Sequence, residues 1–463
     1  MTAKQQEIRE ILKKQKTFFR SGGTKDPAFR AEKLRLLGQA VELHEKEIME
    51  ALNRDLGKPP FEAYSAEVGL VQREIDYALK HLRSWTRARK VLTPLINFPG
   101  SSFILPEPYG VALIIGPWNY PFQLLFSPLI GAIAAGNCAI IKPSEIAPAT
   151  SAVMAALVST HFDPSFIAVA EGDAETARLL LEEKFDYLFF TGGTAVGRVV
   201  MQAAARHLTP LTLELGGKNP CIVGKDAPLE ATARKIAWGK FMNAGQLCVA
   251  PDYLLVDKTI KERLLEHLIA VIRKFYGDDP LKSPDYARII NERHFHRLSA
   301  LLGNGRIVLG GQTEAGSRYI APTVIDGVSW DDPVMQDEIF GPILPILEYE
   351  NLDEVVNFLS GKPKPLALYF FSQNRALQER IMRETSSGGV CLNETVSHII
   401  SANLPFGGVG ESGLGAYHGQ ATFNTFSHMK SVLRKGFFPD LPLKYPPYRK
   451  SLGLIRTLLK YFS

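Results

Sequence analysis

The sequence around one cysteine, Cys248, would allow its thiol to act as a nucleophile. Cys248 lies in the stretch NAGQLCVAP (243–251), among small and apolar residues, with no second cysteine or histidine nearby to suggest a metal site. A free cysteine often serves as a small buried hydrophobe. A thiolate, however, is also a strong nucleophile toward carbonyl carbon. This stretch alone leaves both interpretations open.

Two glycine-rich segments could bind phosphate. Gly192-Gly193-Thr194-Ala195-Val196-Gly197 stands between the apolar run DYLFF and an expected helix, where backbone N–H groups favour an anion. Arg198 excludes a Walker A loop, which needs lysine there. The GxGxxG match at 408–413 lacks both a preceding buried strand and a following helix, so we expect a turn there. The segment 192–197 is therefore the predicted phosphate site.

A carboxylate and a lysine follow the second expected strand of the same region. The run CAII ends just before Lys142, and Glu145 comes three residues later. In doubly wound folds a carboxylate beyond the second strand binds the ribose of a dinucleotide. Alone, the two residues would be an ordinary surface pair. With the glycine turn, they predict NAD as the cofactor. Because Lys142 is beside Glu145, we also expect some activity with NADP.

The elements that would position these groups follow from hydrophobic patterning. Residues 1–90 show helical spacing of apolar positions. From about 109 to 213, continuous apolar runs alternate with helical patterns, and a second alternating region spans about 220–395. Such alternation predicts parallel sheets covered on both faces. A chain of 463 residues is too long for one core, so two or three domains are expected.

Composition narrows the class of protein. The chain is 46% hydrophobic and 22% charged with a formal net charge of +5, which is typical of a globular protein and argues against a nucleic-acid binder. The N-terminus has no apolar signal core, and no apolar run approaches the roughly 20 residues of a membrane span. Four scattered cysteines fit a reducing compartment. We therefore expect a cytoplasmic location and no metal site. The cysteines are Cys138, Cys221, Cys248 and Cys391.

Taken together, seven segments resemble the motif set of the aldehyde dehydrogenase superfamily, in the family's order. The resemblance covers nearly the whole chain. AYHG (416–419), KPSE and the ending FPDLPLKYPPY resemble the class 3, fatty-aldehyde branch. Gly193 is a small departure, since many relatives carry serine there, but the backbone supplies the phosphate donors. The segments are PWNYP (117–121), KPSE (142–145), FTGGTAVG (190–197), ELGGK (214–218), NAGQLC (243–248), EIFGP (338–342) and LPFGGVGESG (404–413).

The resemblance implies an α/β fold in three parts. A Rossmann-like, doubly wound NAD(P)-binding domain would comprise residues 1–86 and 111–213. An α/β catalytic domain would comprise residues 214–395. A bridging and oligomerisation arm, 87–110 and 396–430, would pair with a second subunit to give a homodimer. Residues 431–463 would form a basic C-terminal tail.

The resemblance also assigns chemistry to individual residues. Cys248 would add to an aldehyde as the nucleophile, giving a thiohemiacetal and then a thioester. Asn119, with the backbone N–H of Cys248, would hold the oxyanion. Glu214 would act as general base toward the hydrolytic water. The other three cysteines, which lie in strand-like runs, would be structural. The implied reaction oxidises aldehydes to carboxylic acids with NAD(P)+.

Cofactor and substrate contacts complete the implied site. Trp118 and Leu215 would bind the cofactor, and Glu338 and Phe340 would hold the nicotinamide ribose and ring. The substrate pocket would be an apolar set suited to medium- to long-chain aliphatic or aromatic aldehydes. Its residues are Tyr120, Ile399, Ile400, Leu404 and Phe406.

Two other functions compete with this one. An acylating relative would transfer the thioester to coenzyme A, but Glu214 argues against it, because the base is needed for water. A structural or binding protein could keep the fold without the chemistry, but the joint presence of Asn119, Glu214 and Cys248 argues against that.

The tail has two interpretations of its own. Residues 434–463 contain seven Lys or Arg residues and one acidic residue, Asp440. Leu452, Ile455, Leu459 and Phe462 fall on one helical face. The first expectation is a helix docked over the subunit's own surface. The alternative is an amphipathic helix that makes a weak peripheral contact with an anionic membrane.

Overall fold

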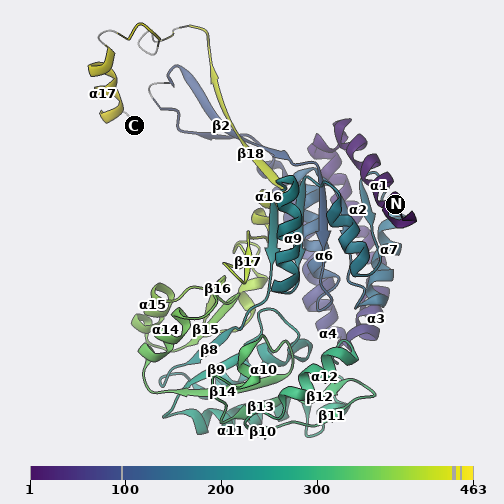
Figure 1. Ribbon diagram of the computed structural model, residues 1–463, viewed down its shortest axis with the longest axis vertical. Helices are drawn as coiled ribbons and strands as arrows, with labels where there is room; N and C mark the ends of the chain where they lie inside the picture. Colours follow the sequence, from purple (N-terminus) through teal and green to yellow (C-terminus); the bar gives the residue numbers. More distant parts are fainter. Residues whose placement is uncertain (1, 95–96, 439, 441–444, 449–450, 462–463) are drawn as a thin grey trace.

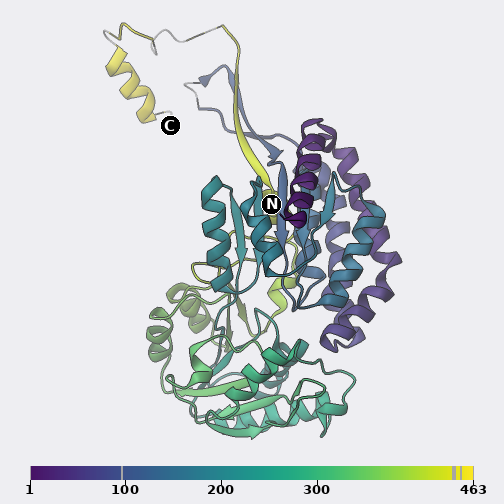
Figure 2. The same ribbon diagram turned by 45° about the vertical axis from the view of Figure 1, so that its right-hand side comes forward.

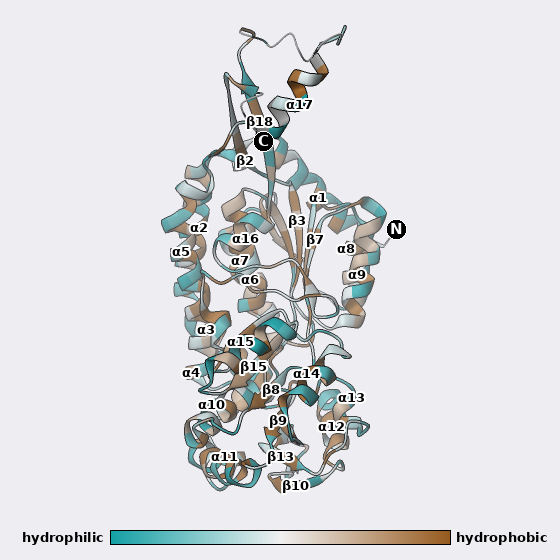
Figure 3. Ribbon diagram, turned by 90° about the vertical axis from the view of Figure 1, so that its left-hand side faces the viewer, coloured by the Kyte–Doolittle hydropathy of each residue, from teal (hydrophilic) through white to brown (hydrophobic). Residues whose placement is uncertain are grey.

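Two parallel-stranded sheets, one beyond the other, form the body of the molecule, and a narrow antiparallel sheet extends from one end (Figure 1). The structure is a computed structural model that describes residues 2–94, 97–438, 440, 445–448 and 451–461. Hydrophobic residues concentrate on strands such as β3 and β7 inside the body (Figure 3). Both faces of these strands are buried, which explains why their sequences are apolar at consecutive positions rather than alternating between apolar and polar residues.

The first sheet has the strand order β17-β7-β6-β3-β4-β5, parallel except for β17. Helices α6 to α9 connect its strands, and α2 and α5 pack on α6 while α3 packs on α7. The strands are β3 (Val111–Ile115), β4 (Cys138–Lys142), β5 (Ile167–Val169), β6 (Tyr187–Thr191), β7 (Leu211–Glu214) and β17 (Gly413–Leu414). The helices are α1 (Ala3–Arg20), α2 (Pro27–Leu43), α3 (Glu45–Leu56), α4 (Pro60–Ala63), α5 (Gly69–Trp85), α6 (Gln123–Ala135), α7 (Pro148–His161), α8 (Ala174–Glu182) and α9 (Thr194–His207).

The order of this sheet creates a switch point between β3 and β6. The chain proceeds from β3 to β4 and β5 on one side, then returns to build β6 and β7 on the other. In open α/β sheets, ligands bind in the crevice at the carboxyl ends of the two strands where this reversal occurs. The loop after β3 carries Asn119, and the turn after β6 carries Gly192 and Gly193. The doubly wound fold thus brings two of the predicted motifs to one crevice.

The second sheet has the order β10-β13-β14-β9-β8-β15-β16, parallel except for β10. All its strands lie within the predicted catalytic range. They are β8 (Pro220–Val223), β9 (Tyr253–Asp257), β10 (Arg306–Leu309), β13 (Thr323–Asp326), β14 (Ile343–Tyr349), β15 (Ala367–Phe371) and β16 (Gly389–Leu392), with a hairpin of β11 (Thr313–Glu314) and β12 (Tyr319–Ile320). The helices are α10 (Leu229–Phe241), α11 (Lys261–Tyr276), α12 (Glu292–Leu301), α13 (Pro333–Gln336), α14 (Leu352–Ser360) and α15 (Arg375–Glu384).

The arm is a sheet of β1 (Arg89–Val91), β2 (Gly100–Pro108) and β18 (Ser427–Lys435) that extends from the body (Figures 1 and 2). It differs from the predicted arm in two ways. β18 runs across the expected boundary at residue 430. The segment before it joins the body instead, because Gly413 of β17 pairs with Glu214 and α16 (Gln420–Thr425) packs on α6.

The tail ends in helix α17 (Ser451–Tyr461), which lies near the arm and away from the two large sheets (Figures 1 and 2). Leu452 is 63% exposed, so the expectation of a helix docked over the subunit's own surface is not met. The side chain of Leu459, and Phe462 as a whole, lie outside the described residues. Among the described residues, no helix combines the length and hydropathy that crossing a membrane requires.

Candidate active site

The turn that carries Cys248 is held by a dense set of hydrogen bonds. It follows α10 through a short 3-10 segment in which Asn243 and Ala244 both have a φ of 51°, an uncommon backbone region for such residues. The Gln246 side chain donates to the carbonyl of Asn243 at 3.0 Å, and the Asn219 amide donates to the carbonyl of Cys248 at 2.8 Å. Strained, over-determined backbone of this kind is common at functional sites.

Cys248 lines two cavities at once. The first, of about 400 Å³, lies at the switch point of the first sheet and also contains Asn119 and Glu214. The second, of about 290 Å³, is lined mostly by apolar side chains from the N-terminal helices, α10 and the segment after β16. Two different molecules can therefore approach the thiol, one from each cavity. This arrangement supports the nucleophile interpretation over that of a core hydrophobe.

Asn119 lies in the loop after β3 with its side chain buried. Its amide nitrogen donates to the carbonyl of Gln246 at 3.1 Å, just before Cys248 in the chain. A carboxamide has two N–H donors, and this bond uses one of them. The other is available to a negatively charged oxygen formed beside the thiol.

Glu214 ends β7 and is only 3% exposed. Neither carboxylate oxygen has a hydrogen-bond partner within the described part of the chain. Burial raises the pKa of this carboxyl well above its ordinary value. A carboxyl whose pKa is raised is a stronger base when ionised, which suits it to accept a proton.

The environment of Cys248 favours the protonated thiol over the thiolate. Burial raises its pKa above the ordinary value, and the carboxyls of Glu338 and Glu214 add to the shift. Because the thiolate is the nucleophile, the residue requires removal of a proton before it can attack.

The cofactor side fits a dinucleotide phosphate against the first turn of α9. Gly193 precedes the helix, and a Cβ built on it would meet no heavy atom within 4 Å. At Gly192, in contrast, a Cβ would lie 2.5 Å from the ring of Phe190. At Gly216 it would lie 2.1 Å from the Glu338 carboxylate. The cavity is therefore open at Gly193, and the other two glycines allow the close packing around it.

Four more predicted cofactor residues, Trp118, Leu215, Glu338 and Phe340, line the same cavity. The rings of Trp118 and Phe340 meet edge to face, 5.3 Å apart, and Phe340 has a φ of 49°, rare for an aromatic residue. Burial, followed by the charge of Asp252, raises the pKa of Glu338 to about 8. The raised pKa favours the protonated carboxyl, the form that can donate a hydrogen bond.

The remaining predicted cofactor residues do not line this cavity. Lys142 is buried at the end of β4, and its ammonium is 2.7 Å from the carboxylate of Glu145, which is 40% exposed. A third cavity, which shares Gly216 and Glu338 with the larger one, is lined in part by Thr194 and Ala195. Val196 and Gly197 lie in the first turn of α9. Val196 is 54% exposed, and a Cβ on Gly197 would lie 2.6 Å from the Leu215 side chain.

On the substrate side, Tyr120, Ile399, Ile400 and Phe406 line the smaller cavity as predicted. The prediction for Leu404 is corrected: its side chain is 52% exposed and is not part of the wall. The sequence also missed side chains that come from helices distant in the chain. They include Phe61, Leu70, Trp238 and Met242 at this cavity, and His294 and Arg297 at the larger one.

Comparisons with known proteins identify the family of the chain. The model of the aldehyde dehydrogenase family matches residues 1–432. The chain is 48% identical to 4,4'-diaponeurosporen-aldehyde dehydrogenase of Staphylococcus aureus, over 96% of this chain and 97% of that protein. It is 46% identical to aldehyde dehydrogenase family 3 member A2 of Mus musculus, over 96% and 92%.

Solved structures give the same result. A substrate-bound Staphylococcus aureus AldH has a TM-score of 0.96 and 47% identity, covering 98% of this chain and 99% of that one. A P. syringae indole-3-acetaldehyde dehydrogenase mutant in complex with NAD+ has a TM-score of 0.85 and 25% identity, covering 93% and 89%.

Proposed function

The chain belongs to the aldehyde dehydrogenase family, and from that premise we propose which of its residues carry the reaction. The protein is an oxidoreductase that oxidises aldehydes to carboxylic acids with a nicotinamide cofactor. The observation that carries our assignment is the position of Cys248 between the two cavities. We assign the larger cavity to the cofactor and the smaller one to the aldehyde.

In the first half of the reaction, the Cys248 thiol transfers its proton to a water molecule, and its sulfur bonds to the aldehyde carbon. The carbonyl oxygen becomes an oxyanion, which accepts hydrogen bonds from the free amide N–H of Asn119 and from the backbone N–H of Cys248. A nicotinamide cofactor held by Trp118, Glu338 and Phe340 would supply the acceptor for the hydride that leaves the tetrahedral carbon. A thioester to Cys248 remains.

In the second half, Glu214 takes a proton from a water molecule that attacks the thioester carbon. The carbon–sulfur bond then breaks, releasing the carboxylic acid and the Cys248 thiolate. The unpartnered, buried Glu214 carboxyl supports this role, since no protein group within the described residues competes for it. A general base that deprotonates the attacking water favours hydrolysis to the free acid over transfer of the acyl group to coenzyme A.

Cys248→Ala tests this assignment. We expect loss of NADH formation while the cofactor still binds, because the other residues of the cofactor cavity are unchanged. Cys391→Ala is the matched control, since Cys391 lies in β16. Turnover by Cys248→Ala, or equal loss in a folded Cys391→Ala protein, would contradict the assignment. Measuring NADH with and without coenzyme A separates hydrolysis from acyl transfer.

The substrate class that we propose is medium- to long-chain aliphatic or aromatic aldehydes. Support comes from the apolar wall made by Ile399, Ile400 and Phe406. Phe61 and Trp238 line the same cavity. Long apolar tails gain roughly 0.8 kcal/mol per buried methylene. Assays with saturated aldehydes of increasing length should show a falling KM, and a preference for acetaldehyde would contradict this.

We propose NAD as the preferred cofactor, with weaker NADP activity. Glu145, partly exposed beyond β4, would accept a hydrogen bond from the ribose 2′-hydroxyl and repel a 2′-phosphate. The ammonium of Lys142 at 2.7 Å reduces that repulsion. Comparison of kcat/KM for the two cofactors tests the preference, which a higher value for NADP would reverse.

We further propose a homodimer, formed with the help of the arm, and a weak contact of the tail with anionic membrane. The exposed Leu433 of β18 supports the first, and the exposed Leu452 and Leu454 of α17 support the second. Light scattering tests the dimer. Sedimentation with anionic vesicles, comparing the full chain with one ending at Tyr448, tests the contact, which should weaken with salt. Equal, negligible pelleting of the full and the shortened chain would exclude the membrane contact. A cytoplasmic location stays a prediction that fractionation can check.

A further inference from the structure

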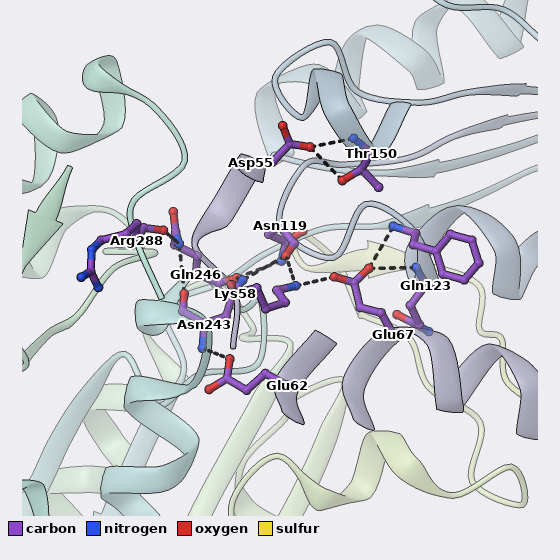
Figure 4. Close-up of polar contacts among 11 residues, drawn as sticks. Asp55, Lys58, Glu62, Glu67, Asn119, Gln123, Thr150, Asn243, Gln246 and Arg288 are labelled. Atoms are coloured by element: carbon purple, nitrogen blue, oxygen red, sulfur yellow. Dashed lines mark hydrogen bonds and ion pairs between the residues drawn. The ribbon is translucent and has the colours of Figure 1, made fainter. Parts of the chain in front are cut away.

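A fully buried ion pair lies behind the loop of Asn119 (Figure 4). Lys58 belongs to the link between α3 and α4, and Glu67 to a π-helical segment, Tyr64–Val68, between α4 and α5. The side chains form a salt bridge, and each is 0% exposed. Desolvation of a buried pair commonly cancels its attraction, so stability alone is a weak reason for it. π-Helical turns also occur often at functional sites.

The ammonium of Lys58 reaches the backbone of the catalytic loop. It donates to the carbonyl oxygen of Asn119 at 3.1 Å and lies 4.0 Å from the centre of the Tyr120 ring. The same carbonyl accepts a second hydrogen bond, at 2.9 Å, from the side-chain amide of Asn243 (Figure 4). The peptide group of Asn119 is thereby fixed between a cation and the turn that leads to Cys248.

The carboxylate of Glu67 holds the other end of the loop. One oxygen pairs with Lys58, and the other accepts from the backbone N–H groups of Phe122, at 2.9 Å, and Gln123, at 3.1 Å. These groups begin α6, where the helix dipole favours a negative charge. Because Lys58 and Glu67 are themselves joined, one ionic unit fixes the backbone before and after Tyr120.

We propose that Lys58 and Glu67 form a positioning pair that aims the side-chain amide of Asn119 at the oxyanion. The inference rests on the proposed role of Asn119. Neither Lys58 nor Glu67 lines the cofactor or the substrate cavity, so the pair acts on the reaction through the Asn119 loop. A misplacement of about 1 Å in a catalytic group can cost about 100-fold in rate, which makes such positioning consequential.

The test compares Lys58→Met, Glu67→Gln and the double variant. Each single change leaves one buried group without its charge partner, so both should lower the Tm. The double variant replaces the pair by neutral side chains of similar length, and its Tm should return toward the wild-type value. The hydrogen bond to the carbonyl of Asn119 stays lost. We therefore expect a burst rate constant of NADH formation that is lower by about 10- to 100-fold, with an unchanged Kd for NAD.

Asp55→Asn is the matched control. The Asp55 carboxylate caps α7 as Glu67 caps α6. It accepts from the backbone N–H of Ala149 at 3.1 Å. It also accepts from the backbone N–H of Thr150 at 2.8 Å (Figure 4). It is similarly buried, 7% exposed, but its cap partners lie on α7. The control should lower the Tm and leave the burst rate constant unchanged at saturating cofactor.

A double variant that regains both the Tm and the wild-type burst rate would overturn the inference, as would an equal slowing in Asp55→Asn. If the double variant is insoluble, Lys58→Met serves alone, because that change removes the hydrogen bond to the carbonyl of Asn119. A normal burst rate in that variant would then contradict the inference. Asn119→Ala separates the two claims: normal kcat in that variant refutes the oxyanion role itself, whereas slow Asn119→Ala with a normal double variant refutes only the positioning pair.

Discussion

Replacement of Asn119 by alanine should lower the catalytic rate much more than the folding stability. The backbone carbonyl of Asn119 makes structural hydrogen bonds, whereas its side-chain amide is the proposed donor to the oxyanion. The backbone carbonyl, which accepts from Lys58 and Asn243, is kept in the variant. The side chain makes one hydrogen bond, to the carbonyl of Gln246, and that carbonyl still accepts from Asn243 at 3.2 Å. One such bond contributes about 1 kcal/mol, so the loss of folding free energy should be of that order.

The catalytic loss should be much larger. Removal of one oxyanion donor typically lowers kcat by about 100- to 1,000-fold, equivalent to about 3 to 4 kcal/mol. Steady-state NADH formation at saturating cofactor gives kcat and KM, and thermal unfolding of the same sample gives the Tm. We expect a large fall in kcat and a small fall in Tm. A kcat within about threefold of the wild type would refute the role of Asn119 as oxyanion donor.

Three further predictions follow from the same site. Glu214→Gln should keep a burst of NADH and slow the following phase, because hydrolysis needs the base and hydride transfer does not; disappearance of the burst would place Glu214 earlier in the reaction. Gly193→Ser should bind cofactor normally, since its Cβ meets nothing within 4 Å, whereas Gly192→Ala should be unstable, since its Cβ would lie 2.5 Å from Phe190; equal Tm values would contradict this. Finally, kcat/KM should rise as the pH is raised, because burial raises the pKa of both Cys248 and Glu214 and the reaction needs their deprotonated forms; a flat profile would exclude these ionisations.

Much of the fold and part of the site could be predicted from local sequence. Buried parallel strands such as β3 and β6 appear as continuous apolar runs, and the residues that follow them, including Asn119 and Gly193, must meet at one sheet edge. The turn at 408–413 was predicted because no buried strand precedes it and no helix follows, and Gly410 and Gly413 pair there as a turn.

Contacts made by distant helices could not be predicted in this way. Lys58 and Glu67 look like ordinary surface charges in the sequence, and only the packing of the N-terminal helices against the loop after β3 buries them. Leu404 was placed in the pocket because it is apolar, but a loop has no periodicity to indicate which side chains face inward. Gly413 was assigned to the arm because two residues of edge pairing with β7 leave no hydrophobic pattern.

The most direct test of the central claim is to locate the covalent intermediate. The Glu214→Gln enzyme, mixed with a long-chain aldehyde and NAD and quenched in acid, should accumulate a thioester that peptide mass spectrometry can map. We predict an acyl mass on the peptide that contains Cys248 and an unmodified Cys391 peptide from the same digest. An acyl group on another cysteine, or NADH formed in the burst without any acyl-enzyme, would contradict the assignment of Cys248 as the nucleophile between the two cavities.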